Sequence, residues 1–325
     1  MMKKELGIFI LLVVLCVATA TINPRFLSQA NLTNMANVIG LFGVFSLGLG
    51  LVIITGGIDL SVGSMCALSG IVLSMALTEW KWAWPLAVLA VVLIPMALGW
   101  AQGALITRVK MQPFIVTLCG LLLYRGIARF IADDGTKGFG DPSNFATLRA
   151  IASGKIFAFH VGDFKFAGLP MPFVALIVIG FILWVVLHRS VYGRYLLAVG
   201  RNEEAARFSG INTRLVITAA YVIAGLLTGI SGIMIAFYTN SVSPSNHGNF
   251  YELYGIAAAV LGGCSLRGGE GSIIGIIIGT ALLQVLQNLV NLLGIPSSLN
   301  FAVMGAVVLL GVLADQLLRQ RARTA

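Results

Sequence analysis

One apolar stretch of this sequence carries four amide side chains at regular spacing. The intervals i, i+3, i+4 and i+7 place them on one face of a helix. Amides both donate and accept hydrogen bonds, so inside a membrane such a face either joins helices or lines a wet path for a polar solute. The sequence leaves both interpretations open. The four amides are Gln284, Gln287, Asn288 and Asn291, and Asn34, Asn37 and Gln102 could face the same space.

A carboxylate lies at a break between two apolar runs. The stretch 55–64 reads Thr-Gly-Gly-Ile-Asp-Leu-Ser-Val-Gly-Ser, with two glycines ahead of Asp59. An ionisable side chain at membrane depth is costly and is generally functional. Asp59 could equally cap the helix that follows, with Ser61 and Ser64 assisting. We therefore treat Asp59 both as a helix cap and as a candidate residue of the solute path.

No catalytic or metal-binding arrangement is evident in the sequence. The three histidines share no spacing with one another or with acids, and the four cysteines lack metal-ligand spacing. The glycine-rich stretch 261–272 lacks the Gly-Lys-Ser/Thr ending of a phosphate-binding loop, and no other stretch has one. We therefore expect a protein that is not an enzyme and that holds no metal or cofactor of its own.

The stretch 198–211 is a charged island in an apolar sequence. Asn202 is a good N-cap, two glutamates follow where the helix dipole favours acids, and Gly210 is a natural helix stop. This pattern predicts a two-turn helix over about 203–209. Such a short helix is marginal alone, so it needs something to pack on; an ordinary capped loop helix is the alternative. The residues that could contact a partner are Arg201, Asn202, Glu203, Glu204, Ala205, Ala206, Arg207, Phe208, Ser209 and Gly210.

The composition indicates an all-α membrane protein with many crossings. Of 325 residues 58% are hydrophobic and 10% charged, whereas soluble domains carry about 25% charged residues. Runs near the ~20 residues needed to span a bilayer predict about ten helices. The eighth is short enough to be a partial or tilted span. The runs are approximately 6–22, 33–55, 60–78, 84–106, 113–132, 170–188, 214–238, 252–265, 273–293 and 299–317.

The cations indicate the orientation in the membrane. The net charge of +9 is spread over short loops, which disfavours nucleic-acid binding and follows the positive-inside rule. Ten crossings put both termini in the cytoplasm, with a loop at about 189–213, and leave 133–169 outside with a short helix near 144–153. We expect the first run to be retained, with a cleaved signal peptide as the alternative. The expected inner cations are Lys3, Lys4, Arg108, Lys110, Arg189, Arg194, Arg201, Arg207, Arg214, Arg267, Arg319, Arg321 and Arg323.

Five motifs together resemble the membrane permease subunits of ribose/xylose-type ABC importers. They lie within 56–64, 113–118, 124–126, 193–211 and 262–272, and the resemblance extends over about residues 30–315. It implies a single permease domain over 1–325 in a bacterial plasma (inner) membrane, paired with a second permease chain as a homo- or heterodimer. Two cytoplasmic ATPase subunits would hydrolyse ATP, and an extracytoplasmic binding protein would deliver a sugar or similar small polar solute.

In this resemblance, the helix at 203–209 is the coupling helix that inserts into the ATPase, and transport proceeds by alternating access. The loop 133–169 has no close counterpart in that family, so the solute stays open. A self-sufficient secondary transporter or channel is the alternative. It would need ionisable residues inside the membrane as a relay, and only Asp59 and Glu252 qualify.

Overall fold

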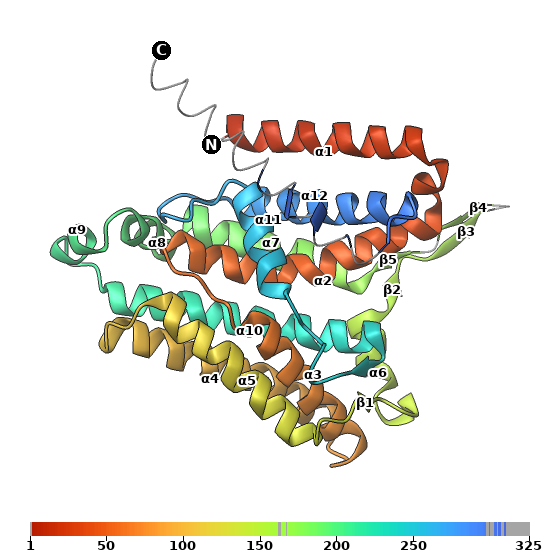
Figure 1. Cartoon of the computed structure of the whole chain (residues 1–325), viewed down its shortest axis with the longest axis horizontal. Coiled ribbons are helices and arrows are strands. Elements are labelled where there is room, and N and C mark those ends of the chain that lie inside the picture. Colours follow the sequence, from red (N-terminus) through yellow and green to blue (C-terminus); the bar gives the residue numbers. More distant parts are fainter. Residues whose placement is uncertain are drawn as a thin grey trace.

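Helices make up most of the structure, and the longest of them run along its long axis (Figure 1). The computed structural model describes residues 2–161, 164–166, 168–296 and, further on, 299, 302–303, 305–306 and 309. The prediction of an all-helical membrane protein is confirmed. The helices are α1 (Met2–Ile22), α2 (Gln29–Ile54), α3 (Val62–Thr78), α4 (Trp84–Arg108), α5 (Pro113–Ala132), α6 (Ala146–Ser153), α7 (Met171–Arg189), α8 (Val191–Arg201), α9 (Glu203–Phe208), α10 (Thr213–Thr239), α11 (Tyr251–Leu261) and α12 (Ile273–Leu292), with 3-10 turns η1 (Pro24–Leu27) and η2 (Pro142–Asn144).

Within the described residues, seven helices are long and apolar enough to cross a membrane, namely α1, α2, α4, α5, α7, α10 and α12. They match seven of the ten predicted runs. Two further runs form shorter helices, α3 with 17 residues and α11 with 11. At 1.5 Å per residue these reach about 25 and 16 Å, less than the ~30 Å of a hydrocarbon core. The tenth run, about 299–317, lies largely outside the described residues, so the count of ten stays a prediction.

The centre of the bundle consists of α2 and α10. In each of them 78% of the most apolar window is buried, against 6% in α1. The most extensive packing is between α10 and α4. Glycines make it possible, because a Cβ on Gly103 would lie 2.7 Å from the Cα of Thr218. Close approach at small residues is the usual way for helices to pack in lipid.

The two short helices, α3 and α11, begin beside each other inside the bundle. Gly63, in the first turn of α3, and Gly248, just before α11, lie so close that neither could carry a Cβ. The carboxylate of Glu252, in the first turn of α11, lies against Gly63. An acid is favourable there because the N-terminal end of a helix carries partial positive charge. Figure 1 shows α11 crossing the long helices at a steep angle.

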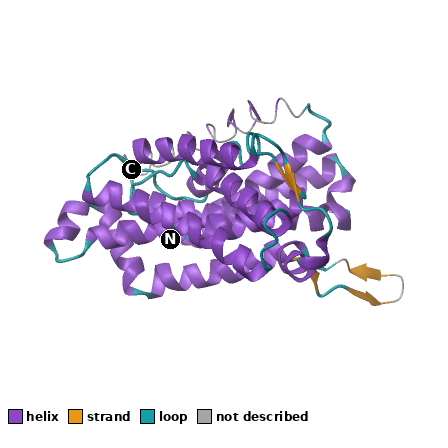
Figure 2. Cartoon of the chain, turned by 90° about the horizontal axis from the view of Figure 1, so that it is seen from below, coloured by secondary structure: helices purple, strands orange, loops and turns teal. Residues whose placement is uncertain are grey.

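The segment between α5 and α7 contains small pieces of regular structure. Three two-stranded antiparallel ladders pair β1 (Lys137–Gly138) with β6 (Ser241–Val242), β2 (Lys155–Ile156) with β5 (Leu169–Pro170), and β3 (Phe159–Val161) with β4 (Phe164–Phe166). The β3–β4 hairpin projects beyond the helices (Figure 2). The predicted short helix near 144–153 is confirmed as α6.

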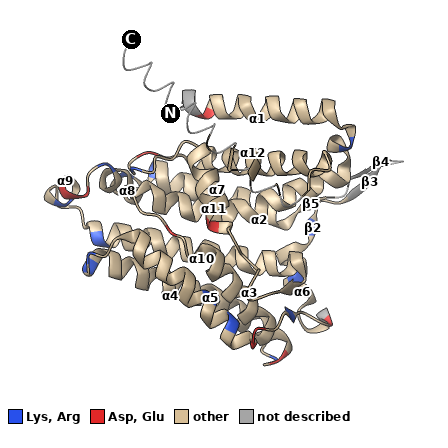
Figure 3. Cartoon of the chain, in the orientation of Figure 1, with Lys and Arg blue, Asp and Glu red and all other residues tan. Residues whose placement is uncertain are grey.

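Most of the charged residues lie towards the two ends of the long axis (Figure 3). We call them the α9 end and, after the β3–β4 hairpin, the hairpin end. The turns after α4 and α11 lie at the α9 end, as do α8 and the start of α10. This end therefore holds Arg108, Lys110, Arg189, Arg194, Arg201, Arg207, Arg214 and Arg267, all from the predicted inner set. The cations Arg319, Arg321 and Arg323 lie outside the described residues.

Candidate functional site

The charged island folds into two helices at the α9 end. Helix α8 buries Leu196 and Val199, which fixes it to the bundle. The side chain of Asn202 then accepts a hydrogen bond from the Ala205 amide at 2.9 Å and begins α9. Gly210 follows with a φ of +84°, a value that suits glycine. The predicted helix over 203–209 is thus confirmed as α9, Glu203–Phe208.

Helix α9 is held from one side and open on the other. Ala206 is buried, its carbonyl accepts from the Ile211 amide at 3.1 Å, and Thr213 Oγ1 donates to Glu203 at 3.2 Å. On the open side the Phe208 ring is 78% exposed. A fixed helix with an exposed aromatic ring is well suited to contact a partner protein.

Charged groups surround the exposed ring. The Arg207 guanidinium lies 5.5 Å from the centre of the Phe208 ring and 3.8 Å from the Glu204 carboxylate. Lys110, from the turn after α4, joins Glu203, Glu204 and Arg207 around a hollow of about 160 Å³. Of the other predicted contact residues, Ala205 accepts from the Ser209 hydroxyl at 2.9 Å and Arg201 lies against Gly269. The role of this surface in coupling stays a prediction.

Three glycine motifs meet directly behind the island. Gly200, near the end of α8, touches the Ile54 carbonyl at the end of α2 and the Gly269 amide in the turn before α12, with no room for a Cβ. The Gly269 amide also donates to the Ile54 carbonyl at 2.8 Å. A Cβ on Gly268 would lie 2.7 Å from the Gly200 carbonyl and 2.8 Å from the Gly56 amide. We call this contact of Ile54, Gly56, Gly200, Gly268 and Gly269 the glycine junction. Here backbone atoms of the island touch the end of α2 and the turn before α12 directly.

Asp59 and Gln102 belong to one buried polar cluster. Asp59 Oδ1 accepts hydrogen bonds from the Ser61 amide at 2.8 Å and from the Ser61 hydroxyl at 2.6 Å. Gln102 Nε2 donates to the same hydroxyl at 2.8 Å. Neither Gln102 Oε1 nor the hydroxyl of buried Tyr221 has a hydrogen-bond partner among the described residues. The contact with the Ser61 amide is an Asx-turn just before α3, whose N-cap is Ser61 without a side-chain cap hydrogen bond, so the prediction that Asp59 caps this helix is wrong.

The amides of α12 lie elsewhere. Asn288 forms hydrogen bonds with Asn31 at the start of α2, Gln284 is buried, and Asn291 is exposed. Helix α12 packs against α1, α2, α7 and α11, whereas α4, which carries Gln102, packs against α3, α5 and α10. Asn34 accepts from the Tyr238 hydroxyl at 3.2 Å. The structure thus separates Asp59 and Gln102 from the stripe of Gln284, Gln287, Asn288 and Asn291.

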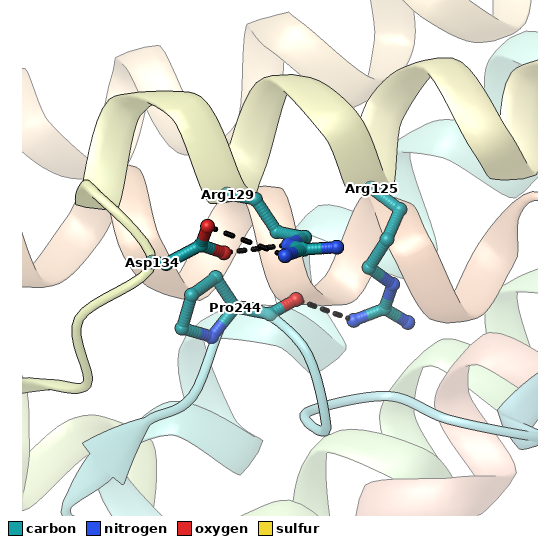
Figure 4. A network of polar contacts seen from close by, with 4 residues as sticks. All are labelled: Arg125, Arg129, Asp134 and Pro244. Atoms are coloured by element: carbon teal, nitrogen blue, oxygen red, sulfur yellow. Dashed lines mark hydrogen bonds and ion pairs between the residues drawn. The ribbon is translucent and has the colours of Figure 1, made fainter.

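Sequence reasoning missed the role of Arg125 in α5. Its Nη1 donates to the Pro244 carbonyl at 2.9 Å (Figure 4) and to the His247 carbonyl at 2.5 Å, which ties the segment before α11 to α5. One turn further, Arg129 donates to Asp134, and this hydrogen bond lowers the pKa of the Asp134 carboxyl. A guanidinium inside the apolar run 113–132 was the available signal.

The described residues contain no group of three His, Cys, Asp or Glu side chains close enough to hold a metal ion. The four cysteines are free, so none of them forms a disulfide with another described residue.

Comparisons with known proteins agree with the motifs. A family model described as "Branched-chain amino acid transport system / permease component" matches residues 31–312. The ribose import permease protein of Bacillus subtilis (strain 168) is 37% identical over 316 residues, covering 96% of this chain and 93% of the relative. The ribose import permease protein of Escherichia coli (strain K12) is 35% identical, covering 94% and 92%. The L-arabinose transport system permease protein of the same strain is 31% identical, covering 98% and 93%. The chain therefore belongs to this family of transport-system permease components.

Proposed function

We propose that this chain is the membrane-spanning permease subunit of an ABC importer for a sugar or a similar small polar solute. The observation that carries the proposal is α9. It presents an exposed Phe208 ring on a helix held to the bundle by Ala206, and it lies next to the glycine junction. Such a surface is suited to receive force from another protein.

The proposed solute class rests on the relatives. Two are named ribose permeases and one an arabinose permease, at 31% to 37% identity. The family description mentions branched-chain amino acids instead. We favour a sugar because the named relatives match nearly full length. Amides and hydroxyls inside the bundle, such as Gln102 and Tyr221, are also groups that bind hydroxyls well.

The proposed arrangement places the α9 end and both termini in the cytoplasm, as the cation pattern favours. An ATPase subunit docks on α9. This separate subunit hydrolyses the ATP, because no phosphate-binding loop occurs in this chain. A second permease chain completes the path, and a solute-binding protein docks at the hairpin end.

In the proposed mechanism, movement of the ATPase displaces α9, and α9 displaces α8. The glycine junction transmits this movement, because its parts touch through backbone atoms that cannot bend away as side chains do. Ile54 and Gly56 flank the break that leads to Asp59 and α3. The movement of α8 therefore reaches the end of α2 and the start of α3, and alternating access to the path follows.

The test is reconstitution in liposomes. Liposomes that contain the chain together with its ATPase and binding protein are expected to take up labelled sugar only when ATP is present on the side where the ATPase lies. As a control, the ATPase carries an inactivated phosphate-binding loop, and no uptake is expected. Uptake by the chain alone, driven by an ion gradient, would instead make it a secondary transporter and overturn the proposal.

A further inference from the structure

A groove lies between the end of α4 and the first turns of α10, at the α9 end. Its volume is about 780 Å³, within the ~300–1,000 Å³ common for small-molecule sites. Small residues form part of its lining, including Thr107, Thr218 and Ala219, whereas Trp100 and Leu215 are exposed at 54% and 62%. The groove therefore opens on the outer surface of the bundle, and the two glycine-packed helices α4 and α10 form its walls.

The lining divides into a charged end and an apolar end. Arg108 closes α4, and Asn212 and Arg214 begin α10, so these three polar residues lie together at the α9 end. From Arg214 to Ile223 the helix rises about 13 Å at 1.5 Å per residue, and Leu215, Ala219 and Val222 line this stretch. A sugar would need polar partners all around it. An amphiphile with one polar head needs them at one end only.

The charge of the head follows from the two arginines. No acidic residue lines the groove. Neither Arg108 nor Arg214 forms an ion pair or a side-chain hydrogen bond with any residue that the structure describes. Basic residues at the end of a membrane helix lie near the bilayer surface, where they attract anionic headgroups.

We propose that this groove binds one anionic phospholipid, with its phosphate between Arg108 and Arg214 and an acyl chain along Leu215, Ala219 and Val222. The groove is lined by neither Asp59, Gln102 nor the amides of α12. It lies beside α9, since Asn212 caps α10 four residues after α9 ends and Lys110 follows Arg108 by two.

The experiment is native mass spectrometry of the full chain in neutral detergent, titrated with phosphatidylglycerol or phosphatidylcholine. The wild type is expected to bind phosphatidylglycerol more tightly. The R108Q/R214Q variant is expected to lose this preference, with roughly fivefold weaker binding per arginine. The matched variant R189Q/R194Q removes two cations from the same end outside the groove and is expected to bind as the wild type does.

Two further arms make the result decisive. Ala219→Trp keeps both arginines but fills the acyl part of the groove, so it is expected to weaken phosphatidylglycerol binding even if R108Q/R214Q does not fold. Equal losses in R108Q/R214Q and R189Q/R194Q would overturn the proposal, because the binding would then follow net charge. Displacement of phosphatidylglycerol by millimolar inorganic phosphate would also overturn it, as would a change of oligomeric state in Ala219→Trp with unchanged lipid binding.

Discussion

Asn31 and Asn288 form hydrogen bonds with each other twice. Asn31 Nδ2 donates to Asn288 Oδ1 at 3.1 Å, and Asn288 Nδ2 donates to Asn31 Oδ1 at 2.8 Å. Asn31 Nδ2 also donates to the Phe26 carbonyl at 2.9 Å. The pair joins the first turn of α2 to α12. The sequence left open whether Asn288 joins helices or lines the solute path. This geometry favours the joining of helices.

Asn288→Leu is expected to destabilise the protein by about 1–2 kcal/mol, because both hydrogen bonds between Asn31 and Asn288 are lost at a half-buried helix contact. Thermal unfolding in detergent measures this loss. The double variant N31L/N288L is expected to recover part of it, since no amide is then left unpaired. Gln287→Leu, on the same face, is the matched control. Normal stability together with lost uptake in Asn288→Leu would instead place Asn288 in the solute path.

Gly200→Ala is expected to disturb the glycine junction. The new Cβ meets the Ile54 carbonyl and the Gly269 amide, and overpacking of this kind costs about 1–3 kcal/mol. In the reconstituted importer the expected result is ATP hydrolysis with reduced sugar uptake. Gly7→Ala in α1 is the control, because nothing lies within 4 Å of its Cβ. Wild-type coupling in Gly200→Ala would mean that force does not pass through the junction.

Phe208→Ala is expected to weaken binding of the ATPase subunit while the chain still inserts into the membrane. Aromatic anchors at interfaces contribute about 2 kcal/mol or more, which corresponds to a loss of roughly thirtyfold in affinity. Co-purification at several salt concentrations measures the change. Phe130→Ala, whose ring is 87% exposed in α5 near the hairpin end, is the matched control. Equal recovery of the ATPase with both variants would remove Phe208 from the docking surface.

Asp59→Asn separates the hydrogen bonds that Asp59 accepts from Ser61 from its charge. Asparagine keeps an acceptor for the Ser61 amide and hydroxyl, so its stability and uptake are expected to stay near wild type. Asp59→Leu removes the acceptor of the buried Ser61 amide and hydroxyl. Each lost acceptor is expected to lower the free energy of unfolding by about 1–3 kcal/mol. Thermal unfolding and sugar uptake are measured on both. A folded Asp59→Asn protein without uptake would show that the carboxylate charge serves transport itself.

Local features of the fold could be predicted from the sequence. Seven apolar runs predicted seven helices, because length and composition alone decide whether a helix suits the membrane. Asn202 and Gly210 predicted the limits of α9, since caps act within a few residues. The cap predicted for Asp59 is wrong, because its carboxylate accepts from Ser61 in a turn that precedes α3.

Contacts between distant residues could not be predicted. The sequence shows Gly56, Gly200 and Gly269 as parts of three separate motifs, and nothing in their spacing says that they meet. The separation of Gln102 from the α12 amides was missed similarly, because helical periodicity gives a face but not the neighbour of that face. The run 60–78 forms α3, Val62–Thr78, but its contact with Gly248 and Glu252 could not be read from hydropathy.

The contact of α3 with α11 has a consequence for the synthesis of the protein. The start of α3 is covered by Gly248 and Glu252, which leave the ribosome long after α3 itself. A nascent chain therefore carries an uncovered helix start inside the bilayer until the second half of the protein arrives. A ribosome that stalls before residue 252 therefore leaves a product in which the start of α3 has lost this cover.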